Sequence, residues 1–132
     1  MASAEPKTRP TDVPVGAFLT TIEPAARRTD AERAVELISA TTGVVPVMWG
    51  TSIVGWGETE GPVPWPRVGY SPRKAKQVFY LLDDDAPAQH LLARLGPHSR
   101  GRSCLYIQRL DAVDERVLAD LVLLAWGRSI TA

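Results

Sequence analysis

Apolar residues in the first third of the chain recur with the period of an α-helix. Two sets follow i, i+3, i+4, i+7 spacing: Val15, Phe18, Leu19 and Ile22, then Ala31, Ala34, Val35 and Ile38. Pro24 separates the two sets, and Gly43 follows the second as a helix stop. The pattern therefore predicts two amphipathic helices before residue 44, each with one apolar face to bury.

The middle of the chain changes to short runs of β-branched and aromatic residues. Five runs predict strands: "VPVMWG", "TSIVGWGE", "VGYS", "KQVFYLL" and "SCLYIQRL". The proline-rich "TEGPVPWPR" predicts a loop between the second and third runs. The fourth and fifth runs are apolar at nearly every position, which is typical of strands that are covered on both faces.

Two further helices complete the predicted order. A helix over 86–95 ends at Gly96 and Pro97, and Asp114 is placed to cap a last helix with a wide apolar stripe. The order is ααββββαβα. It predicts an α+β fold, a two-layer α/β sandwich with a mostly antiparallel five-stranded sheet.

One junction is expected to differ from the antiparallel rule. The fourth run, the 86–95 helix and the fifth run have the spacing of a β-α-β unit, which predicts that these two strands are parallel. Parallel neighbours begin at the same edge of a sheet, so the segments 71–74 and 98–103 that precede them are expected to meet there.

This meeting defines the candidate ligand site. The residues expected to converge are Ser71, Arg73, Lys74, His98, Arg100, Gly101, Arg102 and Ser103. Hydroxyls, guanidinium groups and amides beside a glycine form a cradle for phosphate, sulfate or carboxylate. The alternative interpretation is that these residues are solvated turn charges.

Composition narrows the class of protein. The 132 residues are 45% hydrophobic and carry fifteen basic and fifteen acidic side chains. We therefore expect one domain over 11–132 after a flexible tail over 1–10, with no general attraction to nucleic acid. No apolar run approaches the roughly 20 residues that span a bilayer. The single cysteine suits a reducing compartment, so we expect a cytoplasmic protein without a membrane partner, its oligomeric state left open.

Catalytic and metal chemistry have weaker support in the sequence. Cys104 and His98 could act as a thiolate and its base, but Cys104 lies in an apolar run and is expected to be buried. The run 83–85 could hold a hard cation, although capping of the 86–95 helix is the expected role. We assign no catalytic residue, no metal ligand and no cofactor, with an enzyme using His98 and Cys104 as an alternative.

Three ordered motifs resemble a known family. "PVMWGTSIVGWG", "VGYSPRKAKQVFYLL" and "LGPHSRGRSCLYIQRLDAVD" are similar to the bacterial YdhG-like domains, a family of unknown function. The resemblance implies an α/β sandwich. Some members are described as frataxin-like, which implies an alternative role as an intracellular iron chaperone. The function expected here is a non-enzymatic binding module, whose basic end takes a small anionic ligand or an acidic protein surface.

Overall fold

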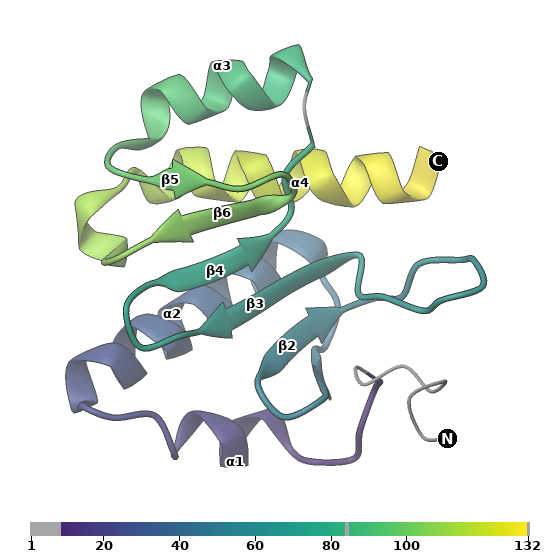
Figure 1. Cartoon of the computed structure of the whole chain (residues 1–132), viewed down its shortest axis with the longest axis vertical. Helices are drawn as coiled ribbons and strands as arrows, with labels where there is room; N and C mark the ends of the chain where they lie inside the picture. The colour runs from purple at the N-terminus through teal and green to yellow at the C-terminus, as the bar shows by residue number, and fades with distance from the viewer. Residues whose placement is uncertain (1–8, 84, 132) are drawn as a thin grey trace.

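The computed structural model describes residues 9–83 and 85–131, which form an α+β fold (Figure 1). The helices are Val15–Leu19 (α1), Ala25–Thr42 (α2), Ala86–Leu95 (α3) and Glu115–Thr131 (α4), with a 3-10 turn at Leu110–Ala112. The strands are Val47–Trp49 (β1), Ile53–Trp56 (β2), Val68–Pro72 (β3), Gln77–Tyr80 (β4), Ser99–Arg100 (β5) and Cys104–Ile107 (β6). In this part of the chain, no helix is long and apolar enough to cross a membrane.

The strands form one open antiparallel sheet in the order β1-β2-β3-β4-β6-β5. Figure 1 shows α2 and α4 together behind the sheet, while α3 lies beyond the β5 edge and packs on α4. We call the helix-covered side the inner face and the opposite side the outer face. The α+β class and the antiparallel sheet are confirmed, whereas the described sheet has six strands rather than five, and the extra strand β5 changes the predicted element order after α3.

The predicted parallel pairing was wrong. β4 and β6 are antiparallel, with Gln77 opposite Ile107 and Tyr80 opposite Cys104. The error comes from β5, a two-residue strand that the sequence analysis placed in a basic turn. β5 pairs antiparallel with β6, so β5 itself runs parallel to β4 and β6 lies between them. A β-α-β unit therefore exists, but it joins β4 to β5 and its two strands are not neighbours.

Helix termini follow local chemistry in most places. Gly43 ends α2 in the left-handed conformation at φ 71°, as expected. Asp85 caps α3 by accepting a hydrogen bond from the Ala88 amide, and Asp114 accepts from the amides of the first turn of α4. The second helix begins earlier than its apolar stripe indicates, at Ala25, because Pro24 supplies an extended N-cap.

Arg9 and Pro10, which the sequence analysis assigned to a tail, lie against β1. Pro10 forms a bridge with Trp49, and the Arg9 carbonyl accepts a hydrogen bond from the Gly50 amide at 2.8 Å. Residues 1–8 of the expected tail lie outside the described residues. The segment entering α1 is therefore tied to the first edge of the sheet.

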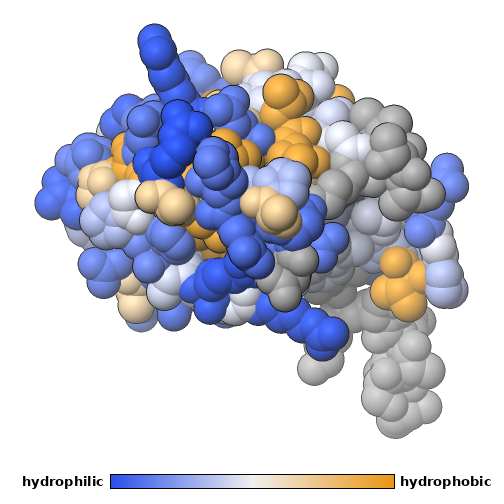
Figure 2. Space-filling model, turned by 90° about the horizontal axis from the view of Figure 1, so that it is seen from above, coloured by the Kyte–Doolittle hydropathy of each residue, from blue (hydrophilic) through white to orange (hydrophobic). Residues whose placement is uncertain are grey.

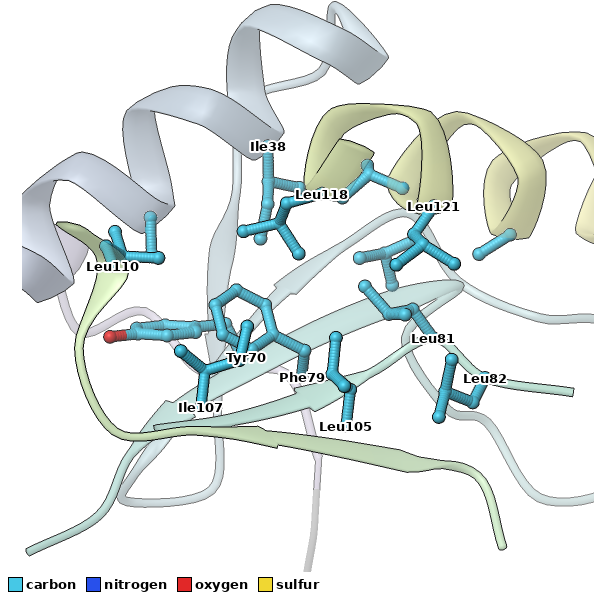
Figure 3. Close-up of a cluster of buried hydrophobic side chains, with 14 of the residues drawn as sticks. Ile38, Tyr70, Phe79, Leu81, Leu82, Leu105, Ile107, Leu110, Leu118 and Leu121 are labelled. Atoms are coloured by element: carbon cyan, nitrogen blue, oxygen red, sulfur yellow. The ribbon is translucent and has the colours of Figure 1, made fainter. Parts of the chain in front are cut away.

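The hydrophobic core fills the space between the inner face and the helices (Figure 3). Phe79 and Leu105 point from neighbouring strands toward Leu118 and Leu121 of α4, and Ile38 of α2 closes the same cluster. All five side chains are fully or almost fully buried. Burial of one such side chain contributes roughly 1.5–3 kcal/mol to the free energy of folding, so the packing of the inner face holds the helices against the sheet.

Among residues 9–83 and 85–131, α2 and α4 lie on the inner face, and aromatic rings cover much of the outer face. Three glycines of this face each lie against a ring: Gly55 against Trp49, Gly69 against Tyr80, and Gly101 against Tyr106. A Cβ atom added at these glycines would come within 2.5, 3.2 and 3.0 Å, respectively, of the nearest ring or hydroxyl atom. The rings can lie close to the backbone because glycine leaves room for them.

Candidate functional site

The antiparallel β4–β6 pair separates the two basic turns. The 71–74 turn precedes β4 at one end of the sheet, whereas residues 101–103 form the β5–β6 hairpin loop at the other end. His98 precedes β5 and, since β5 runs parallel to β4, it lies at the same end as the 71–74 turn. The single converged cradle expected from the sequence is therefore not formed.

The residues of that expected site have separate surroundings. Ser71 is 1% exposed, and its hydroxyl donates to the Ser52 carbonyl at 2.8 Å. His98 is exposed, with Nδ1 2.7 Å from the Gly96 carbonyl oxygen. Arg100 is half-buried beside its own hairpin, while Arg102 and Ser103 are exposed. Ser71 is consequently committed to the fold, and the sheet separates residues 101–103 from the 71–74 turn.

A different polar cavity lies at the 71–74 turn. It has a volume of about 40 Å³ and is lined by Arg27, Asp30, Pro72, Arg73, Lys74, Ala75, Lys76, Gln77 and Gln108. Because a cavity needs roughly 10–15 Å³ to hold one water molecule, this hollow accommodates a group of a few heavy atoms. We call it the turn cavity.

The floor of the turn cavity is a buried hydrogen-bond network. The Tyr70 hydroxyl donates to Gln77 Oε1 at 2.6 Å, and Gln77 Nε2 donates to Asp30 Oδ2 at 3.1 Å. The Leu110 amide donates to the same carboxylate oxygen at 3.0 Å. Burial raises the pKa of the Tyr70 phenol, and the Asp30 charge raises it further. The network fixes Asp30 and Gln77 as structural groups.

Four cationic residues surround this floor, against the one carboxylate of Asp30. Arg27 is held in place, because its Nη2 donates to the Pro72 carbonyl at 2.9 Å and its Nη1 bonds the Glu23 carbonyl. Arg73, Lys74 and Lys76 are exposed. Within the described residues, the amides of Lys74 and Ala75 have no hydrogen-bond acceptor. The cavity therefore combines net positive charge with guanidinium and ammonium donors, a combination that suits an anion.

Two of these cations also contact the aromatic outer face. Arg73 Nη2 donates to the Tyr80 hydroxyl at 3.2 Å, and Lys76 Nζ lies 4.1 Å from the Tyr106 ring centroid. Trp65, from the 57–67 loop, meets Tyr80 edge to face, with ring centroids 5.9 Å apart and an interplanar angle of 89°. Basic side chains of the β3–β4 turn thus contact aromatic side chains of the outer face.

Cys104 is not the core residue that the sequence analysis expected. It is half-buried on the outer face, opposite Tyr80, because β6 alternates Leu105 and Ile107 inward with Cys104 and Tyr106 outward. The pKa of the Tyr106 phenol is raised, first by electrostatic interaction with the neighbouring Cys104 and then by a hydrogen bond to it. His98 precedes β5 and Cys104 begins β6, so the two residues lie at opposite ends of the sheet and form no thiolate–imidazole pair.

Within residues 9–83 and 85–131, no group of three or more His, Cys, Asp or Glu side chains is placed to hold a metal ion. An open apolar groove of about 1060 Å³ lies between α3 and α4, with Leu91, Leu123 and Leu124 in its lining. Figure 2 views the molecule from above and shows apolar residues at the surface among hydrophilic ones.

The sequence predicts the 71–74 part of the basic surface but not the contribution of Arg27, Lys76 and Gln77. Gln77 carried a readable signal, since it is a polar residue at the start of an otherwise apolar run. Arg27 carried none, because its place depends on how α2 packs against a turn that is 45 residues away. Comparison with models of protein families, with curated proteins and with solved structures finds no match for this chain.

Proposed function

We propose that this domain is a non-enzymatic binding module for a small anionic ligand, which it holds at the turn cavity. The observation that carries the proposal is the cavity itself, a polar hollow of about 40 Å³ with four cationic residues around it. The site keeps Arg73 and Lys74 from the expected residues and replaces the 98–103 segment with Arg27 and Lys76.

The chemistry favours an oxyanion over a neutral ligand. A phosphate, sulfate or carboxylate takes charge-assisted hydrogen bonds from guanidinium and ammonium groups and further bonds from backbone amides. Arg27 is already fixed by two carbonyl contacts, so little side-chain freedom is lost when it binds. Asp30 keeps its negative charge, but the four cationic residues that line the same cavity outnumber it.

The family resemblance stays part of the proposal. A YdhG-like domain is consistent with the α+β fold, but the implied iron role has no described carboxylate cluster to rest on. Asp30 of α2 accepts hydrogen bonds from Gln77 and Leu110, which gives this carboxylate a structural role. We therefore develop the anion-binding role alone.

The test is a two-dimensional amide NMR titration with inorganic phosphate. We expect saturable shifts centred on residues 73–76, and a weakening of at least about fivefold in the Arg73→Ala/Lys74→Ala variant. Arg102→Ala is the matched control, since it removes an exposed arginine from the opposite end of the sheet and should bind phosphate as the parent does. Shifts that do not saturate, or an equal loss in the control, would contradict the proposal.

A further inference from the structure

We infer that the anion is carried on a planar aromatic group, as in a nucleoside monophosphate, with its ring on the outer face beside the turn cavity. The inference rests on the proposed function, because it extends the same site. The observation behind it is the pair of contacts that join the cavity to the aromatic surface: Arg73 to Tyr80 and Lys76 to Tyr106.

The outer face offers two tyrosine rings on which a ligand ring can stack and a tryptophan beside them. Tyr80 and Tyr106 lie on the same face of neighbouring strands, as diagonal neighbours in the β4–β6 register. Trp65 stands at 89° to the Tyr80 ring and is 37% exposed, so part of the indole remains open to solvent. A flat ring placed beside Trp65 would therefore stack on one tyrosine and meet the indole at its edge.

The rings of Tyr80 and Tyr106 are held in position before any ligand binds. The rings of Tyr80 and Tyr106 lie against Gly69 and Gly101, where no side chain intervenes between ring and backbone. The two tyrosines are half-buried, and each has a cation in contact from the β3–β4 turn. Rings fixed in this way lose little conformational freedom when a ligand stacks on them.

Lys76 links the two halves of the site. Its ammonium lies over the Tyr106 ring, and the same residue lines the turn cavity. A base that stacks on Tyr106 would displace the ammonium, which is then free to bind the phosphate of the same ligand. Because an exposed cation–π contact is weaker than base–aromatic stacking, this exchange favours a ligand that has both groups.

The test compares three probes by isothermal titration calorimetry: inorganic phosphate, ribose 5-phosphate and adenosine 5′-monophosphate. We expect the nucleotide to bind about fivefold or more tighter than ribose 5-phosphate, the range that stacking of one base provides. The Tyr106→Leu variant should lose this preference, while Tyr106→Phe, which keeps the ring, should retain it. Trp65→Ala is a second variant for measuring the preference for the nucleotide, because Trp65 is exposed and its loss leaves the core intact.

The outcomes separate the inference from the function beneath it. If ribose 5-phosphate and the nucleotide bind equally at residues 73–76, the aromatic inference fails and the anion site stands. If none of the three probes binds, both fail. A nucleotide preference that survives both Tyr106→Leu and Trp65→Ala in folded protein also overturns the inference, since the ring would then lie elsewhere.

Discussion

The buried pair of Tyr70 and Gln77 makes a sharp prediction about stability. Tyr70 is 0% exposed and Gln77 is 6% exposed, and each side chain satisfies the other through a 2.6 Å hydrogen bond. Tyr70→Phe leaves Gln77 Oε1 without its donor, and we expect a loss of about 1–2 kcal/mol in the free energy of unfolding. Gln77→Leu leaves the Tyr70 hydroxyl unpaired and removes a donor from Asp30, so we expect about 2–4 kcal/mol.

The double variant distinguishes this account from simple loss of packing. With both partners gone, neither is left as a buried unpaired group, so the two costs should not add. We expect the double variant to be more stable than the sum of the single changes predicts, by about 1 kcal/mol or more.

Urea denaturation followed by tryptophan fluorescence measures each free energy of unfolding, provided that the m-values agree. Tyr80→Phe is the matched control, because this phenol is half-buried and its described bond goes to exposed Arg73. We expect its cost to stay below about 1 kcal/mol. Additivity of the Tyr70 and Gln77 changes within about 0.5 kcal/mol would refute the reasoning, since it would mean that the two groups do not satisfy each other.

Three further predictions concern pH, packing and the cysteine. Burial raises the pKa of Tyr70 above its ordinary 10.0, so the unfolded chain loses this proton first and the free energy of unfolding should fall above about pH 10. The slope contributed by this one group is at most about 1.4 kcal/mol per pH unit. Tyr70→Phe should remove that part of the slope in urea denaturation at alkaline pH. Gly55→Ala places a Cβ 2.5 Å from the Trp49 ring and should cost about 3 kcal/mol or more in chemical denaturation; a loss under about 0.5 kcal/mol would contradict the close approach. Cys104→Ser should lower the free energy of unfolding by less than about 1 kcal/mol in the same assay, because Cys104 is half-buried. A loss of several kcal/mol would instead mean that the thiol is packed in the core.

Most of the fold could be predicted from the sequence because its elements have clear hydrophobic periods. The stripe of α2, the apolar runs of β4 and β6 and the cap at Asp114 all appear in the structure. The direction of β6 was not readable, because it depends on β5, a strand of two polar residues, Ser99 and Arg100. A strand so short shows no alternation, and its identity comes only from pairing with residues 105 and 106.

The candidate site was readable only in its local part. Arg73 and Lys74 lie in a proline-containing turn between two apolar runs, where charged residues are expected on the surface. Arg27, Asp30 and Gln77 meet through the packing of α2 against the start of β4, and no spacing in the sequence encodes that contact. Turn chemistry is thus local, while the cavity built on the turn is a tertiary feature.

The glycines of the outer face have a consequence for how this sequence can change over generations. At Gly55 the ring of Trp49 occupies the space that any Cβ would need, so neither position can drift alone. A Cβ at residue 55 would also lie 2.7 Å from the Pro66 Cβ, so a larger residue there needs both neighbours to change, and a smaller residue at 49 alone would leave the strand uncovered. Position 55 should therefore stay glycine among descendants of this chain for as long as Trp49 and Pro66 are kept.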